Sequence, residues 1–167
     1  MQLTTAQDKF VSEWGRLSSN WGVNKAMGQI HAILLISNAP MNSDEIMANL
    51  EMSRGNVNMN IKSLIHWGLI KKGSQKGCRK DYYTAEKEPW KLLCTVARER
   101  KRREIEPAID ALDECLSEVS SLKSKEAKAF KQQLTELQEF LQMADRVFSR
   151  LGKAERSSVL KWLTKLI

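Results

Sequence analysis

The second half of the chain carries apolar residues at alternating spacings of four and three positions, which restricts this half to long helices. The longest such run is Phe130, Leu134, Leu137, Leu141, Ala144, Phe148 and Leu151. A shorter run comes before it at Ile105, Ile109, Leu112, Leu116 and Val119. This spacing is typical of a helix that buries one stripe against a partner helix. We therefore expect long helices at about 89–122 and 124–151, and a last helix at about 154–166.

Two prolines and a basic segment refine this expectation. Pro89 suits the first turn of a helix, and Pro107 predicts a kink or a break in the middle of the first long helix. The segment RERKRR, residues 98–103, could contact phosphates, although a solvated helix face is the simpler interpretation. The apolar runs can be buried within one chain or between two copies of it. We favour a homodimer.

The first half of the chain predicts shorter helices separated by turns. The spacing of its apolar residues favours one helix at 4–18 and a second, largely apolar core helix at 25–36. Asn42 and Glu45 have the spacing of a capping box. They place the start of a short third helix, which ends near residue 50.

A fourth helix and a hairpin follow. Ser53 suits the start of this helix, Gly68 suits its end, and one apolar stripe runs between them at Val57, Ile61, Leu64 and Ile65. Strand-like residues on both sides of the polar turn 73–77 predict a β-hairpin with a basic tip. The order helix, short helix, tight turn, helix and hairpin is that of a winged helix-turn-helix.

The predicted fold is therefore mostly α, with three parts. Residues 1–22 form an N-terminal helix that we expect to pack on the helical region. Residues 23–88 form the winged helix-turn-helix domain with its small β-hairpin wing. Residues 89–167 contribute long C-terminal helices that form a dimerisation region.

The positive charge of the chain is concentrated in one segment. The formal net charge is +7, and the 28 residues from Ser53 to Lys80 hold seven Lys or Arg residues and no Asp or Glu. The remaining residues therefore sum to zero. A patch of one sign is expected of a protein that binds a polyanion, although a solvated basic face is the alternative.

The fourth helix contains three asparagines, which weaken a helix interior because their side chains compete for backbone hydrogen bonds. With the apolar stripe inward, the outward positions are Gly55, Asn56, Met59, Lys62, Ser63 and His66, and the flanks are Arg54, Asn58 and Asn60. In a DNA major groove, Asn pairs with adenine, and Arg or Lys pairs with guanine. Gly55 would let a phosphate approach the helix N-terminus. The alternative is that these asparagines are ordinary surface residues.

Two stretches, SRGNVNMNIKSLIHWGLIKK and GCRKDYYTAEKEPW, resemble the GbsR-like branch of the MarR-type winged helix-turn-helix transcriptional regulators. The resemblance covers about residues 25–95. It implies a dimeric, cytoplasmic regulator that binds double-stranded DNA at a near-palindromic operator. Together with the outward face, it assigns DNA binding to Ser53, Arg54, Gly55, Asn56, Asn58, Met59 and Lys62 of the recognition helix. On the wing it implies Lys76, Arg79 and Lys80, with Arg79 in the minor groove.

One position departs from this family. Relatives commonly have an Asp before the wing arginine, where it holds the guanidinium, and this chain has Cys78 there. Either Asp81 takes over this role, or Arg79 is less preorganised. Some members of the family sense osmolytes such as choline, but this sequence shows no motif for such a ligand.

Several other classes of protein do not fit the sequence. The three cysteines have no zinc-site spacing, and with two histidines they make a metal site a poor expectation. No paired carboxylates, phosphate-binding glycine loop or nucleophile motif indicates an enzyme, and we expect no cofactor. No apolar run is long enough to span a bilayer, and the N-terminus lacks signal-peptide features, so a cytoplasmic location is expected. The alternative function is a helical assembly protein whose basic hairpin does not read DNA.

Five tryptophans are a further feature: Trp14, Trp21, Trp67, Trp90 and Trp162. If several indoles gathered between the DNA-reading and dimer-forming parts, they could form an aromatic cage for a quaternary ammonium effector. We favour the simpler interpretation, in which they fill the core and the interfaces. The identity of a small-molecule effector stays open.

Overall fold

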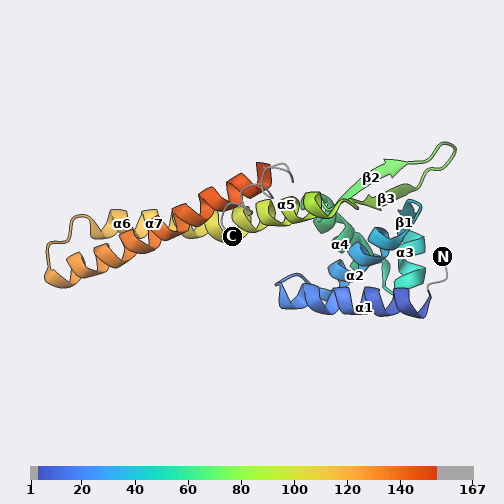
Figure 1. Cartoon of the computed structure of the whole chain (residues 1–167), viewed down its shortest axis with the longest axis horizontal. Helices are drawn as coiled ribbons and strands as arrows, with labels where there is room; N and C mark the ends of the chain where they lie inside the picture. Colours follow the sequence, from blue (N-terminus) through green and yellow to red (C-terminus); the bar gives the residue numbers. More distant parts are fainter. Residues whose placement is uncertain (1–3, 154–167) are drawn as a thin grey trace, which may run out of the picture. The chain divides into compact units, whose positions relative to one another are not determined.

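The computed structural model describes residues 4–153, which divide into two compact units. The first unit ends at Leu92 and the second begins at Leu93 (Figure 1). Most described residues are helical, and one small antiparallel sheet lies in the first unit. This is the mostly α fold with a β-hairpin wing that the sequence predicts.

The first unit contains four helices whose bounds follow from local sequence signals. They are α1 (Thr5–Asn20), α2 (Lys25–Ile36), α3 (Ser43–Leu50) and α4 (Arg54–His66). At the start of α3 the predicted capping box is present: Asn42 Oδ1 accepts from the backbone N–H of Glu45 at 3.1 Å, and Glu45 Oε2 accepts from the N–H of Asn42 at 2.7 Å. At the end of α4, Gly68 has a φ of 74°, which glycine adopts without strain.

Helix α1 packs along α2 within the first unit, where the sequence led us to expect packing on the C-terminal helices. Two glycines make this contact close. A Cβ at Gly28 would lie 2.4 Å from Ser18 Oγ, and a Cβ at Gly15 would lie 2.5 Å from Gln29 Cγ. Gly15 lies within α1 and lets this helix approach its neighbour.

The sheet has three strands in the order β1-β3-β2. Strands β2 (Ile70–Ser74) and β3 (Asp81–Ala85) form the predicted hairpin, with Lys72 opposite Tyr83. Strand β1 (Met41–Asn42) pairs with the other edge of β3 and was not predicted, because two residues are too short to show strand periodicity. The sheet ties the wing to the segment just before α3.

The core of the first unit lies between α2, α3 and α4. Its most deeply buried side chains are Ile30, Ile33, Ile46, Val57, Leu64 and Asn60. Five of these six are aliphatic, and one is a carboxamide. Ile65, which the sequence placed in the buried stripe, is instead 37% exposed. This packing holds α4 with its opposite face free for other contacts.

The second unit consists of helices joined by one irregular turn. They are α5 (Pro89–Arg100), whose first turn still belongs to the first unit, a π-helical turn η1 (Lys101–Ile105), α6 (Glu106–Val119) and α7 (Lys125–Lys153). The irregularity predicted from Pro107 is present, two residues before it. Proline lacks an N–H and its ring clashes with the carbonyl four residues back, and the wider π turn accommodates both effects. Lys101 in this turn forms ion pairs with Glu106 at 2.5 Å and with Asp145 of α7 at 2.9 Å, which connect the turn to both helices.

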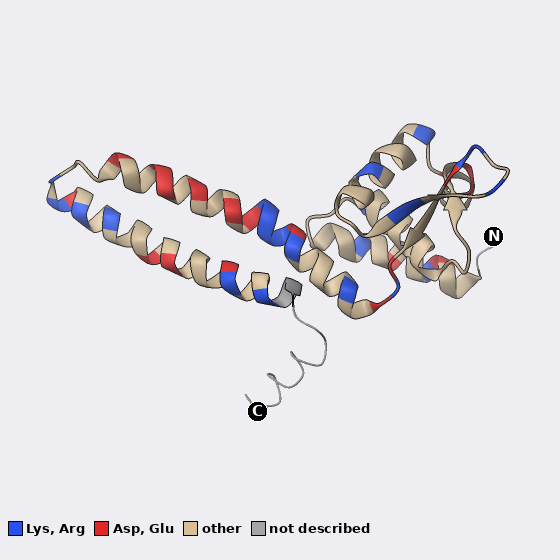
Figure 2. Ribbon diagram, turned by 90° about the horizontal axis from the view of Figure 1, so that it is seen from above, with Lys and Arg blue, Asp and Glu red and all other residues tan. Residues whose placement is uncertain are grey.

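Helices α6 and α7 lie side by side in both ribbon views and pack against each other (Figures 1 and 2). The predicted seam of α7 is divided between two environments. Leu134, Leu141 and Phe148 are half-buried, whereas Phe130 and Leu137 are 47% and 48% exposed. Part of the apolar run is thus buried within the chain. The predicted helix at 154–166 lies outside the described residues.

Candidate nucleic-acid interface

Helix α4 follows α3 after a tight connection, whose shape depends on Glu51 at the end of α3 and Ser53 at the start of α4. Glu51 adopts a left-handed conformation (φ 51°) at the end of α3, which turns the chain within a few residues. Ser53 then caps α4, because its Oγ accepts a hydrogen bond from the backbone N–H of Asn56 at 3.4 Å. Short connections of this kind fix the angle between the two helices of a helix-turn-helix.

The outward face of α4 carries the residues that the sequence assigned to DNA binding. Arg54, Asn58 and Lys62 are exposed, Met59 is 60% exposed, and Asn56 is half-buried. A Cβ at Gly55 would meet nothing within 4 Å, so packing within the chain does not require a glycine there. The face combines amide and cationic groups with an open helix N-terminus, and it contains no carboxylate.

One of the three asparagines has a different place from the predicted one. We expected Asn60 at the flank of α4, but its exposed fraction is 1%. This prediction was wrong because Asn60 lies three residues after Val57 and four before Leu64, which places it on the same face as the buried stripe. It therefore belongs to the core and not to the candidate interface.

Both the amide nitrogen and the amide oxygen of Asn60 form hydrogen bonds, in a network that extends to Asn56 on the outward face of α4. Its Nδ2 donates to Asn56 Oδ1 at 2.7 Å and to the Asn56 carbonyl at 2.8 Å. Its Oδ1 accepts from Asn24 Nδ2 at 2.8 Å, and Asn24 caps α2 by accepting from the N–H of Met27 at 2.8 Å. The buried carboxamide thus ties α4 to α2 and fixes the amide orientation of Asn56.

The wing carries its cations on an exposed hairpin, which Figure 2 shows as blue along the strand and the loop. Lys72 pairs with Asp81 across the strands at 2.7 Å. Within the part of the chain that the structure describes, Lys76 and Arg79 form no hydrogen bond or ion pair. Of the two alternatives left by the departure at Cys78, the structure therefore favours an Arg79 that is less preorganised.

The thiol at position 78 has its own contacts. Tyr82 donates its hydroxyl to Cys78 Sγ at 3.7 Å. A hydrogen bond from the backbone of Lys80 is the main cause that lowers the pKa of the Cys78 thiol, and the Tyr82 hydroxyl contributes to the same effect. The residue that replaces the family's Asp is thus half-buried against the hairpin.

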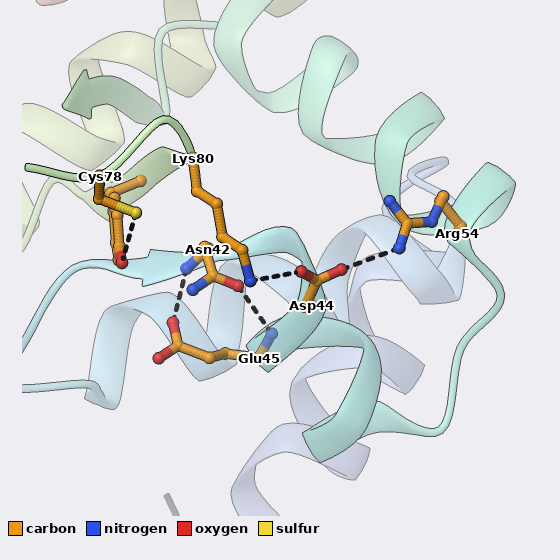
Figure 3. A network of polar contacts seen from close by, with 7 residues as sticks. Asn42, Asp44, Glu45, Arg54, Cys78 and Lys80 are labelled. Carbon is orange, nitrogen blue, oxygen red and sulfur yellow. Dashed lines mark hydrogen bonds and ion pairs between the residues drawn. The ribbon is translucent and has the colours of Figure 1, made fainter. Parts of the chain in front are cut away.

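A carboxylate that the sequence did not single out joins α4 to the wing. Asp44 accepts from Arg54 Nη2 at 3.0 Å through Oδ1 and from Lys80 Nζ at 2.9 Å through Oδ2 (Figure 3). The Lys80 hydrogen bond is the largest cause that lowers the pKa of the Asp44 carboxyl. No sequence signal marks this contact, because an acid in the first turn of a helix is ordinary and its partners lie 10 and 36 residues away.

Cations of the basic segment 98–103 form ion pairs with nearby carboxylates. Arg102 pairs with Glu99 at 2.6 Å, and Glu99 is 6% exposed. Arg100 pairs with Glu104 at 3.3 Å. These contacts support the interpretation of a solvated helix face over a phosphate site.

The tryptophans of the first unit form a small aromatic group. Trp14 contacts Phe10, Trp21 and His31, with ring centroids 5.4, 6.0 and 6.4 Å away. His31 is 7% exposed, its Nε2 has no hydrogen-bond partner, and burial lowers the pKa of its imidazole to about 4. These contacts favour the packing interpretation. Trp162 lies outside the described residues.

Comparison with known proteins places this geometry in context. No protein-family model matches the chain. The chain is 22% identical over 121 residues to the HTH-type transcriptional repressor GbsR of Bacillus subtilis (strain 168), over 72% of this chain and 67% of the relative. It is 22% identical over 91 residues to the putative HTH-type transcriptional regulator YvaV of the same organism, over 54% of this chain and 51% of the relative. A solved crystal structure of a transcriptional regulator superposes with a TM-score of 0.72 at 22% identity, over 89% of this chain and 97% of that chain.

These similarities confirm the resemblance to GbsR-like HTH regulators and the fold class predicted from the sequence. The relatives are regulators and not enzymes. Across residues 4–153, no helix combines the length and the apolar character needed to cross a membrane.

Proposed function

We propose that this relative of the GbsR-like HTH regulators is a sequence-specific DNA-binding transcriptional regulator that acts as a homodimer on a near-palindromic operator in the cytoplasm. The observation that carries the proposal is the exposure of all seven cations of the segment 53–80, on α4 and on the wing beside it. In this arrangement α4 enters the major groove, where its N-terminal residues reach base edges. The wing adds contacts to phosphates or to the minor groove through Arg79.

The direct test is selection of duplexes from a random library, followed by affinity measurement in a gel shift. We expect one enriched sequence with inverted half-sites, bound at least about a thousandfold more tightly than a shuffled duplex of equal composition. DNA upstream of the protein's own gene is a second probe. Equal affinity for enriched and shuffled duplexes would overturn the proposal and favour the alternative of a helical assembly protein.

Two substitutions on the outward face of α4 test which residues read DNA. We expect Asn56→Ala and Lys62→Ala each to weaken binding to the enriched duplex by about 1–3 kcal/mol, because each removes one base or phosphate contact. Loss of a base contact affects only the enriched duplex, whereas loss of a phosphate contact weakens both duplexes. Lys128→Ala, an exposed position on α7, is the matched control. Affinities equal to the wild type in both variants would refute the assignment.

The homodimer is supported by a second apolar face on α7. Its large exposed side chains are Phe130, Leu137, Phe140, Met143 and Val147, and their exposed fractions lie between 47% and 58%. These residues lie beside the half-buried residues that meet α6, on the same helix. A face of this kind in water is costly, and a second copy of the same helix would bury it on both sides.

We expect the double variant Leu137→Glu, Phe140→Glu to be monomeric at micromolar concentration, with operator affinity reduced at least about tenfold. Each large apolar side chain contributes about 1.5–3 kcal/mol when buried, and a charge in its place has to be desolvated. Light scattering measures the mass, and Gln142→Glu adds a carboxylate elsewhere on α7 as the control. A wild-type protein that is monomeric under the same conditions would contradict the dimer.

A further inference from the structure

The carboxylate of Asp44 binds two cations that come from the two DNA-facing elements. Asp44 is the second residue of α3, Arg54 is the first residue of α4, and Lys80 is the last residue of the wing loop, just before β3. Each carboxylate oxygen forms an ion pair with one cation, so Arg54 and Lys80 can bind Asp44 at the same time (Figure 3). All three side chains are substantially exposed, with fractions of 44% for Asp44, 69% for Arg54 and 56% for Lys80.

We infer that Asp44 is a positioning residue that determines DNA specificity, by holding Arg54 and Lys80 in fixed orientations at the junction of recognition helix and wing. This inference rests on the proposed DNA-binding function. Asp44 itself does not contact DNA in this arrangement. It acts through the two cations: it lowers the affinity for phosphates of any sequence and raises the discrimination between sequences.

The geometry at Arg54 gives the first reason. A guanidinium carries five N–H donors in a rigid plane, so fixing one nitrogen restricts where the others can point. Asp44 engages Nη2, which leaves the remaining donors for an acceptor pair such as guanine O6 and N7. An arginine that is already oriented also loses less side-chain entropy when it binds.

The charge of the cluster gives the second reason. Two cations and one carboxylate leave a net charge of +1, so the cluster attracts phosphate less strongly than two unpaired cations would. The hydrogen bond to Asp44 raises the pKa of the Lys80 ammonium, and Lys80 in turn lowers the pKa of the Asp44 carboxyl. The Asp44 carboxyl and the Lys80 ammonium are therefore both ionised at neutral pH. A carboxylate at this place suppresses binding to phosphates of any sequence.

The wing offers a matched comparison in the pair of Lys72 and Asp81. This pair has the same chemistry, a 2.7 Å separation and exposed fractions of 54% and 47%. Both of its residues belong to the hairpin, and neither contacts the recognition helix in the described interactions. Asp81→Asn therefore changes the charge of the surface by the same amount as Asp44→Asn without releasing Arg54.

The experiment compares Asp44→Asn with Asp81→Asn on two probes, the duplex enriched by the wild type and its shuffled counterpart, at several salt concentrations. We expect both variants to bind the shuffled duplex more tightly, with a salt dependence steeper by about one counterion. We expect the ratio of the two affinities to fall about tenfold in Asp44→Asn and to stay within about twofold in Asp81→Asn. The same change of ratio in both variants, or an unchanged ratio in Asp44→Asn, would overturn the inference.

A double-mutant cycle separates positioning from a general loss of structure. Arg54→Lys keeps the charge and removes the planar fork, so it should lower the affinity ratio in the wild-type background. In the Asp44→Asn background it should have little further effect, because the orientation is already lost. Fully additive effects would overturn the inference. Failure of the proposed function looks different, since the wild type itself would then enrich no duplex.

Discussion

Replacement of Asn60 by alanine is expected to lower the free energy of unfolding by about 2–4 kcal/mol. Asn60 is 1% exposed, so the change opens a cavity, and it leaves Asn24 Nδ2 and Asn56 Oδ1 without their partner. Chemical denaturation followed by circular dichroism measures the change.

The control for Asn60 is Asn58→Ala on the same helix. Asn58 is exposed, and its replacement should change the free energy of unfolding by less than about 0.5 kcal/mol. Asn60→Ala should also weaken operator binding, because the amide of Asn56 loses the donor that orients it. Equal stability of the two variants would show that the buried network contributes nothing.

The second large effect concerns His31 and pH. Burial lowers the pKa of the His31 imidazole from 6.5 to about 4, so between these values the unfolded chain binds a proton that the folded chain does not. Above pH 6.5 the imidazole is neutral in both states, so its burial as a neutral group costs no stability through protonation. As the pH decreases from 6.5 towards 4, the free energy of unfolding falls, because only the unfolded chain gains this proton. The difference between these two pKa values corresponds to about 3 kcal/mol of unfolding free energy across that window.

The measurement is the free energy of unfolding at several pH values for the wild type and for His31→Leu. The difference between the two isolates the histidine from the carboxylates that titrate in the same range. We expect the difference to grow in favour of His31→Leu as the pH falls from 7 to 4. We also expect the variant to be at least as stable as the wild type at pH 7, because it removes an Nε2 without a partner. A difference that does not change with pH would refute the prediction.

Local signals in the sequence were sufficient for most element bounds. The capping box at Asn42, the proline at position 89 and the glycine at position 68 act on residues within one turn, and the helices begin or end where these residues stand. The exposed cations of the wing follow from the same local reasoning, because a hairpin of polar residues has no core to enter.

The parts that could not be predicted depend on residues far apart in the chain. The buried amide of Asn60 accepts a hydrogen bond from Asn24, 36 residues earlier, and Asp44 binds Lys80 across the same separation. The spacing on α7 predicts apolar stripes but not which stripe meets α6 and which stays exposed. Which stripe is buried depends on how α6 and α7 pack, and the periodic pattern of one helix carries no information on that packing.

The close approach of α1 and α2 at Gly15 and Gly28 determines where the compact unit that contains the helix-turn-helix begins. Helix α2 is buried along most of its length, and Ile30, Ala32 and Ile33 have exposed fractions of 0%. Helix α1 supplies Val11 and Ser18 as part of that cover. A fragment that started at residue 23 would therefore keep every predicted DNA contact and still leave one side of its central helix in water. A fragment meant to keep the winged helix-turn-helix folded on its own should therefore start at Thr4, the cap of α1.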